Sequence, residues 1–277
     1  MIDKYADRWA LVTGASAGIG AEFARQLAAR GMHLVLVARR EERLRELAKE
    51  LDTRHGTHCE IITADLSQPE EPKRVYEAVA EKGITIELLV NNAGFGFVGV
   101  IEDTDIERML AMIRLNVAAL TELTYRYLPE MLQRGHGAII NVSSISAFQP
   151  VAYMPVYAAT KAYVLHFSEA LWAEARDRNV TVLALCPGTT QTEFFNVAGV
   201  PGWLKKHRGH SPKKVVRTAL KAMEKKRQYV VPGWGNYFLA QGCRFARRKM
   251  VVLQSMRFFR PTKKSEEKNG EASQNQS

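Results

Sequence analysis

Tyr157 and Lys161, in the stretch SSISAFQPVAYMPVYAATKAY (residues 143–163), have the types and spacing of a proton-transfer site. They are four residues apart, so both would lie on one face of a helix. Free tyrosine and lysine both titrate at about pH 10, but a neighbouring cation lowers the pKa of a phenol. Lys161 could therefore make Tyr157 a usable acid and base for interconverting an alcohol and a carbonyl compound. Taken alone, the pair could equally be two stacked surface side chains.

Ser144 adds a hydroxyl to this pair, thirteen residues before Tyr157. It ends the apolar run GAIINVSS, which predicts a buried strand. Ligands of parallel α/β proteins bind at the carboxyl ends of the strands. Ser144 could therefore hold a substrate oxygen and stabilise the charge that develops on it.

A glycine-rich loop lies in ALVTGASAGIGAEFA, where Gly14, Gly18 and Gly20 separate an expected strand from an expected helix. Glycines permit a tight turn and a close approach to a pyrophosphate, and the helix offers free N–H groups to the negative charge. Such a loop alone could be only a tight turn, but its place between a strand and a helix favours a dinucleotide site.

Two arginines follow the second expected strand, in LVLVARREERL. An acidic residue here would bind the ribose hydroxyl of NAD. Arg39 and Arg40 instead suit the 2′-phosphate of NADP, because a guanidinium forms paired, charged hydrogen bonds with phosphate. We therefore predict NADP(H) as the cofactor. The alternative is that both arginines are surface charges at the start of a helix.

Strands and helices alternate along most of the chain. Seven strands are predicted by the apolar runs WALVTG, HLVLVAR, CEIITADL, IELLVNNAG, GAIINVSS, VTVLALCPG and QYVVPG. Amphipathic stretches between them predict helices, with long ones near 105–134 and 155–178. This alternation indicates a parallel sheet with helices on both faces. We predict an α/β fold, a doubly wound parallel sheet of the Rossmann type, as a single domain over residues 1–235.

Together these motifs resemble those of the short-chain dehydrogenase/reductase family. The glycine loop reads TGxxxGxG, and four further elements follow in the family's order: Asp65, NNAG at 91–94, Asn116, and Ser144 with Tyr157 and Lys161. PGTTQT at 187–192 completes the set. The resemblance spans about residues 8–195, with weaker support to 233. It implies a Rossmann fold, a nicotinamide cofactor and reversible oxidation of an alcohol.

The resemblance also implies a role for each candidate catalytic residue. Tyr157 would be the acid and base, Lys161 would tune it and hold the nicotinamide ribose, and Ser144 would position the substrate oxygen. Ser144 is preferred to Ser143 because the family's serine lies thirteen residues before the tyrosine. Asn116 would link Lys161 to solvent through a water, unless it is a buried amide satisfied by backbone.

The expected cofactor residues follow from the same motifs. Asp65 would lie near the adenine, and it could also cap the next helix. Ala17 stands where many NADP-using relatives carry a basic residue, which departs from the pattern. The residues expected to bind the cofactor are Gly14, Ser16, Gly18, Ile19, Gly20, Arg39, Arg40, Asp65, Leu66, Asn92, Ala93, Gly94, Tyr157, Lys161, Pro187, Gly188, Thr190 and Thr192.

Basic residues are concentrated in the C-terminal quarter. The net charge is +10, yet residues 1–202 hold 20 basic and 25 acidic residues, whereas residues 203–268 hold 19 basic and 3 acidic ones. An anionic partner would therefore meet this quarter. No nucleic-acid-reading motif accompanies the charge, so nucleic acid is not an expected partner.

Residues 236–260 form a basic amphipathic C-terminal extension. Phe238, Phe245, Val252 and Phe259 recur every seven residues, so one helical stripe would be apolar, with basic residues around it. Two interpretations stay open. The segment either packs on the enzyme or a second subunit, or lies on an anionic membrane surface.

Two further segments flank this extension. In the family, the region of residues 193–212 is a mobile lid, and Phe194, Phe195, Val197 and Trp203 could line an apolar pocket; the alternative is ordinary helix packing. Residues 261–277 almost lack apolar side chains, so we expect a disordered tail.

Other features restrict the class of protein. Three widely spaced cysteines predict neither a disulfide framework nor a zinc site, and the histidines show no metal spacing. The N-terminal residues lack the pattern of a signal peptide, and no run of about 18 apolar residues predicts a membrane span. We expect a cytoplasmic protein without a metal, and the extension leaves peripheral membrane contact open.

We predict an NADP(H)-dependent oxidoreductase that acts on a lipophilic alcohol, ketone or aldehyde. By analogy, the two long helices would pair subunits into a homodimer or homotetramer. A related epimerase or dehydratase would have two residues between the first two glycines, where this chain has three. The alternative from another class is an NAD(P)-binding sensor or regulatory protein without turnover, which the loss of a catalytic residue would favour.

Overall fold

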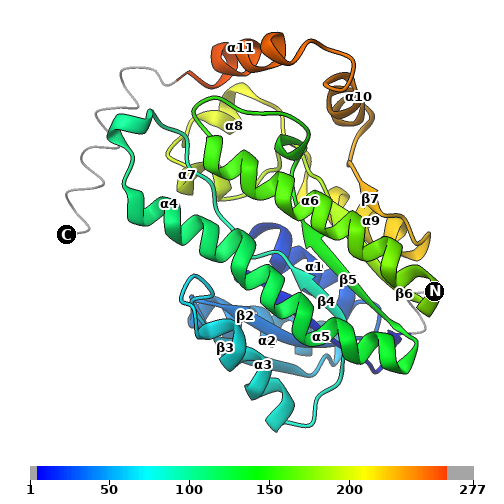
Figure 1. The fold of residues 1–277 in the computed structure, drawn as a ribbon. Coiled ribbons are helices and arrows are strands. Elements are labelled where there is room, and N and C mark those ends of the chain that lie inside the picture. The colour runs from blue at the N-terminus through cyan, green and yellow to red at the C-terminus, as the bar shows by residue number, and fades with distance from the viewer. Residues whose placement is uncertain (1–4, 261–277) are drawn as a thin grey trace.

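A computed structural model describes residues 5–260, so the tail predicted for 261–277 lies outside the described residues. Seven strands form one sheet in the order β3-β2-β1-β4-β5-β6-β7, and every neighbouring pair is parallel (Figure 1). The predicted doubly wound Rossmann fold is therefore confirmed. The strands are β1 (Trp9–Thr13), β2 (His33–Ala38), β3 (Cys59–Thr63), β4 (Ile86–Asn91), β5 (Gly137–Val142), β6 (Val180–Leu185) and β7 (Tyr229–Val230).

Helices cover both faces of the sheet, which is why most residues of its strands are apolar and buried. Successive residues of β1 point to opposite faces: Ala10 and Val12 pack into one core, and Leu11 packs into the other. The first core lies under α1 (Gly18–Ala28), α2 (Glu41–His55) and α9 (Pro212–Glu224). The second lies under α3 (Glu71–Glu81), α5 (Leu120–Arg134) and α6 (Pro155–Ala175).

The strand order places a ligand crevice at one edge of the sheet. β1 has β2 on one side and β4 on the other, so the chain reverses its direction of winding beside β1. In open α/β sheets, ligands bind at this switch point, outside the carboxyl ends of the strands. The loops after β1, β4, β5 and β6 all reach this edge.

The helix expected near 105–134 is interrupted. Asp105 caps α4 (Ile106–Ile113) by accepting a hydrogen bond from the backbone N–H of Glu107. A π-helical segment, Arg114–Ala119, then leads into α5. Single π-helical turns within α-helices are often found at functional sites. The segment carries Asn116.

The C-terminal extension forms two helices, α10 (Trp234–Gly242) and α11 (Arg248–Phe259), where the seven-residue repeat had indicated one continuous stripe. Phe238 and Phe245 are exposed, whereas Phe259 stacks on Trp203. α11 lies across the end of the molecule, above α8 (Trp203–Lys206) (Figure 1). The Oγ of Ser255 accepts a 3.0 Å hydrogen bond from the backbone N–H of Ala152, which fixes α11 to the loop before α6. Within the described residues, no helix is both long and apolar enough to cross a bilayer.

Candidate active site

A cavity of about 880 Å³ opens at the carboxyl edge of the sheet and contains nearly all of the predicted site residues. Seventeen of the eighteen expected cofactor residues line it. The exception is Gly20, which lies beneath the loop. Ser144 lines the cavity as well, whereas Asn116 lies behind its wall. Residues predicted from distant parts of the sequence are thus brought to one place.

The catalytic candidates come from β5 and α6. Ser144 follows β5 and begins a short 3₁₀ turn, where its Oγ accepts a hydrogen bond from the backbone N–H of Ser146. Tyr157 and Lys161 lie in the first two turns of α6, and all three side chains are buried. The Nζ of Lys161 donates a 2.8 Å hydrogen bond to the carbonyl of Val142 and lies 5.7 Å from the centroid of the Tyr157 ring.

Burial controls the acidity of both groups. Burial raises the pKa of Tyr157 to about 12, although a hydrogen bond from Ser144 lowers this pKa in part. It lowers the pKa of Lys161 to about 8. The expectation that Lys161 lowers the pKa of Tyr157 is not met by these side-chain positions. The physical reason is that both groups lose solvation, and the ammonium group is directed to a backbone carbonyl.

Asn116 is fully buried and holds the loop after β4. Its Oδ1 accepts from the backbone N–H of Phe95 at 3.1 Å, and its Nδ2 donates to the Phe95 carbonyl at 3.0 Å. Nδ2 also lies 3.2 Å from the hydroxyl of Thr160, on α6. Asn116 therefore ties the loop wall to the helix that carries Tyr157 and Lys161, and its side chain is satisfied by protein groups.

The glycine loop leaves no space for side chains. Gly14 and Gly18 have φ values of +65° and +56°, which favour glycine. A Cβ on Gly20 would lie 2.2 Å from the carbonyl oxygen of Gly14. The N-terminus of α1 follows at Gly18 without a side-chain cap, so its first N–H groups are free to bind an anion. The loop therefore fits a dinucleotide pyrophosphate.

The two arginines after β2 lie at the far end of the cavity. Arg40 donates to the hydroxyl of Ser16 at 3.1 and 3.2 Å and to Glu193 at 2.8 Å. Arg39 is exposed and lies 3.7 Å from Asp65. Asp65 lines the cavity and accepts from the backbone N–H and the hydroxyl of Ser67. It does not cap the next helix, α3, whose N-cap residue is Glu70 and which has no side-chain cap.

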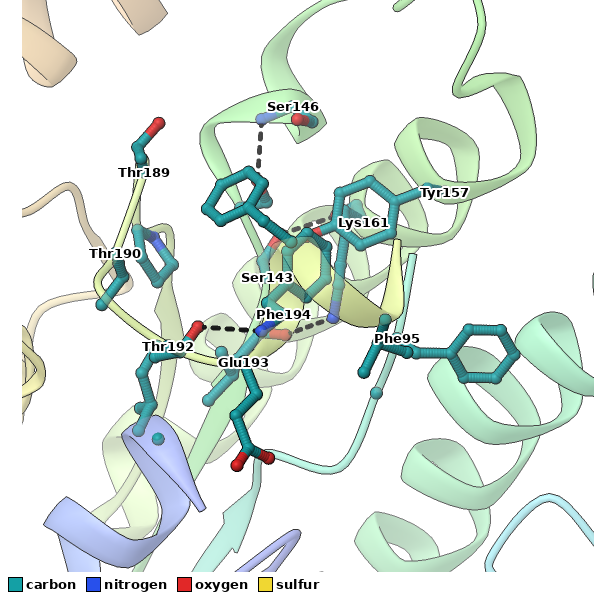
Figure 2. A pocket seen from close by; sticks show the side chains of 18 of the residues that line it. Phe95, Ser143, Ser146, Tyr157, Lys161, Thr189, Thr190, Thr192, Glu193 and Phe194 are labelled. Atoms are coloured by element: carbon teal, nitrogen blue, oxygen red, sulfur yellow. Dashed lines mark hydrogen bonds between the residues drawn. The ribbon is translucent and has the colours of Figure 1, made fainter. Parts of the chain in front are cut away.

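An aromatic wall closes the opposite end. Phe194, in α7 (Phe194–Val197), lies 5.4 Å from the Tyr157 ring, and Figure 2 shows the two rings together beside Lys161. Phe195 stacks on Trp203 at 5.6 Å, and Trp203 stacks on Phe259 of α11 at 5.2 Å. The lid residues thus form a pocket wall, as one of the two interpretations predicted.

Sequence reasoning missed several residues of this site. The Oγ1 of Thr13 accepts from the backbone N–H groups of Asn92 and Ala93 at 2.9 and 3.0 Å, which joins the glycine loop to the NNAG segment. The threonine of TGxxxGxG was the available signal. Glu193, which binds Arg40, and the α11 side chains in the cavity wall had no local signal. In the described part of the chain, no cluster of metal-ligating side chains is present.

Comparisons with known proteins identify the family to which the chain belongs. A family model described as short chain dehydrogenase matches residues 8–199. The very-long-chain 3-oxoacyl-CoA reductase of Anas platyrhynchos is 33% identical over 69% of this chain, which covers only 62% of that protein's length. The 7beta-hydroxysteroid dehydrogenase of Mediterraneibacter gnavus is 32% identical over 80% of this chain and 85% of that protein. The human inactive hydroxysteroid dehydrogenase-like protein 1 is 34% identical over 74% of this chain and 63% of that protein.

Solved structures show the same relationship. A short-chain dehydrogenase from Sphingobium yanoikuyae in complex with NADPH superposes with a TM-score of 0.79 at 34% identity, over 88% of this chain and 94% of that one. A 7beta-hydroxysteroid dehydrogenase gives a TM-score of 0.81 at 28% identity, over 92% and 98%. The chain therefore belongs to the short-chain dehydrogenase family of oxidoreductases, which act on hydroxyl and carbonyl groups with a nucleotide cofactor.

Proposed function

We propose that the protein is an NADP(H)-dependent oxidoreductase that interconverts a lipophilic alcohol and the corresponding ketone or aldehyde. The observation that carries this proposal is one continuous cavity, in which Ser144, Tyr157 and Lys161 lie between the glycine loop and an aromatic wall. The cofactor, when bound, would supply or accept the hydride. The residues of this chain would manage the proton and the oxygen.

Tyr157 would be the proton donor in carbonyl reduction. With a pKa of about 12, its phenol stays protonated at neutral pH and can donate to the carbonyl oxygen of a substrate. The Oγ of Ser144 accepts from Ser146, and its hydroxyl, which lies in hydrogen-bonding range of Tyr157, would turn its proton to that oxygen when substrate is bound. One of the three Nζ protons of Lys161 binds Val142, and two are free for ribose hydroxyls.

The positive charges of Arg39 and Arg40 favour NADP(H) as the cofactor. Arg40 borders the cavity beside Ser16, and Arg39 has a side chain that is 73% exposed, so it can turn toward a phosphate. The NADPH complex of the Sphingobium yanoikuyae relative supports the same choice. Arg40→Gln should weaken NADPH binding by about 10-fold or more and leave NADH binding nearly unchanged. Fluorescence titration of both nucleotides measures this, and equal weakening of both would contradict it.

A lipophilic substrate fits the end of the cavity that the aromatic wall closes. The rings of Phe194, Phe195, Trp203 and Phe259 provide an apolar wall beside Tyr157. The relatives include a very-long-chain 3-oxoacyl-CoA reductase and a 7beta-hydroxysteroid dehydrogenase, whose names refer to a long acyl chain and to a steroid. Long-chain 3-oxoacyl and steroid-like ketones are therefore the first compounds to examine.

A screen of such ketones with NADPH tests the proposal, with oxidation of the cofactor followed by absorbance. Tyr157→Phe should reduce turnover by at least about 1,000-fold while NADPH binding is retained, because only the proton donor is lost. Near-normal turnover in this variant would rule out its role. Phe194→Tyr, which keeps the ring beside Tyr157, is the matched control for changes in cavity shape.

A binding protein without turnover remains the second candidate, because one relative is named as inactive. Against it, Asn116, Ser144, Tyr157 and Lys161 are all present and are grouped around one cavity. NADPH binding without oxidation across the whole ketone panel would favour the sensor.

A further inference from the structure

The first observation is an exposed aromatic surface on α10 and the turn that follows it. Trp234, Phe238, Leu239 and Phe245 have exposed fractions of 78, 66, 53 and 90%. The rings of Trp234 and Phe238 lie 6.3 Å apart, and Tyr237 lies 6.0 Å from Phe238, so these three rings are grouped, with Phe245 in the turn that follows the helix. Large apolar groups gathered on a surface usually mark a site of interaction.

The second observation is the charge around this surface. Residues 234–260 contain six basic residues and no acidic residue. Elsewhere, basic side chains such as Arg25 and Arg74 pair with carboxylates. Within residues 5–260, no ion pair involves any of the six, which are Arg244, Arg247, Arg248, Lys249, Arg257 and Arg260.

The third observation is that the surface is continuous with the mouth of the cavity. Leu239 of α10 and Phe258 of α11 each line the cavity, yet they are 53% and 54% exposed. Both side chains therefore lie at the rim. Figure 1 shows α10 and α11 together at the end of the molecule that carries α8 and the lid.

We propose that α10, α11 and the turn between them dock on an anionic lipid bilayer, with the cavity mouth facing the membrane interface. Tryptophan and phenylalanine side chains favour the boundary between headgroups and acyl chains, and unpaired arginines bind lipid phosphates. A second copy of this chain fits less well, because it would bring six like charges against six. The inference concerns binding alone and does not rest on the proposed reaction.

Sedimentation with vesicles tests the proposal on the full chain. The protein should pellet with phosphatidylcholine vesicles that contain about 30% phosphatidylserine, and much less with phosphatidylcholine alone. Binding should fall steeply in about 0.5 M NaCl, because salt screens the attraction of the arginines. The fluorescence of Trp234 should shift to shorter wavelength on binding. Failure of the wild-type protein to pellet with anionic vesicles at low salt would overturn the proposal.

Two variants separate the charges from the rings. Replacement of Arg244, Arg247 and Arg248 by Gln should weaken vesicle binding on the order of 100-fold, since each basic residue near an anionic surface contributes a factor of about 5. Phe238→Ser with Phe245→Ser should weaken it by about 10-fold. Neither set lines the cavity, so NADPH binding should not change.

Matched controls use comparably exposed residues outside α10, α11 and the turn between them. Ile101→Ser with Ile106→Ser removes apolar groups that are 81% and 64% exposed, and Arg178→Gln, Lys225→Gln and Arg227→Gln together remove three exposed charges. Both controls should keep wild-type vesicle binding. Equal loss in the controls would mean non-specific adsorption and would overturn the proposal.

Light scattering after size exclusion distinguishes a protein partner. If the phenylalanine variant lowers the oligomeric mass and leaves vesicle binding intact, the surface is a subunit interface and the proposal is wrong. Reduction of a water-soluble ketone, measured in parallel, reports on the proposed reaction separately. A variant that loses vesicle binding but keeps that reduction supports docking, whereas a wild-type protein that binds vesicles without turnover contradicts only the proposed reaction.

Discussion

Tyr157 and Lys161 are both buried, and loss of solvation moves each pKa in the direction that favours the neutral group. At neutral pH the phenol is protonated, with a pKa of about 12, and the amine, with a pKa of about 8, is still mainly charged. This combination suits proton donation, which is the reductive direction. The hydroxyl of Ser144 is the one side-chain contribution that lowers the pKa of the phenol.

This pairing predicts the pH dependence of carbonyl reduction. Lys161 loses its charge as the pH rises through about 8, while Tyr157 remains protonated, so kcat/KM for reduction should fall above that pH. Lys161→Arg keeps a positive charge at all these pH values, so the fall near pH 8 should disappear even if the rate is lower. Steady-state rates from about pH 6 to 10 measure both profiles. If kcat/KM of the variant still falls near pH 8, the fall is caused by the titration of a group other than Lys161.

The glycine loop gives a second prediction at the same scale. Gly20→Ala would place a Cβ 2.2 Å from the Gly14 carbonyl oxygen, so the loop must shift. We expect a loss of about 1–3 kcal/mol in the free energy of unfolding and at least about 10-fold weaker NADPH binding. Gly235→Ala, in α10, has open space around its Cβ and is the control that should change neither. Thermal denaturation and nucleotide titration give both values.

At the scale of elements, Glu193 connects the lid to the corner that selects the cofactor. It precedes α7 and accepts from Arg40 at 2.8 Å and from Arg43 at 2.7 Å. Hydrogen bonds from these two arginines lower the pKa of Glu193. A 2′-phosphate that binds Arg40 would compete with this carboxylate.

Removal of that competition should strengthen NADPH binding. Glu193→Gln leaves Arg40 free for phosphate, so the Kd of NADPH should fall by about 3- to 5-fold, while the Kd of NADH stays the same. The effect should be no larger, because an exposed ion pair contributes at most about 1 kcal/mol. Glu41→Gln breaks a similar exposed pair, with Arg45, and is the control. Weaker NADPH binding in Glu193→Gln would show that the contact holds the cofactor site in shape.

Sequence patterns predicted the repeated units of this fold but not the contacts between distant segments. Apolar runs located all seven strands, because strands buried on both faces must be apolar. The glycine spacing and the Tyr157–Lys161 pair predicted the site, because cofactor binding and proton transfer require these residue types at these spacings. The π-helical turn at Asn116, the Glu193 contact and the place of α11 depend on tertiary packing, and no local pattern encodes them.

At the scale of the whole molecule, a second aromatic patch lies on α5 and α6. Tyr163 stacks on Phe167 at 5.5 Å and is 39% exposed, and Tyr125 lies 6.2 Å from the same ring and is 62% exposed. These are the two helices through which subunits are expected to pair. The patch would be covered in a homodimer or homotetramer.

A charge placed in this patch should therefore separate the subunits. Tyr125→Glu should lower the mass measured by light scattering to that of one chain, because a buried, unpaired carboxylate is costly. Ile101→Glu adds the same charge at a residue that is 81% exposed and should leave the mass unchanged. A wild-type protein that is already monomeric would refute the pairing.

The stacking of Trp203 has a consequence for how substrates are selected. Its indole lies nearly parallel to Phe195 at an angle of 11° and to Phe259 at 3°, so α7 and α11 share one ring. Withdrawal of either segment would break one of these two ring stacks and expose the indole, so widening of the cavity on this side has an energetic cost. Substrates too bulky for the closed cavity would therefore enter more slowly than small ones, because they require that a ring stack be broken first.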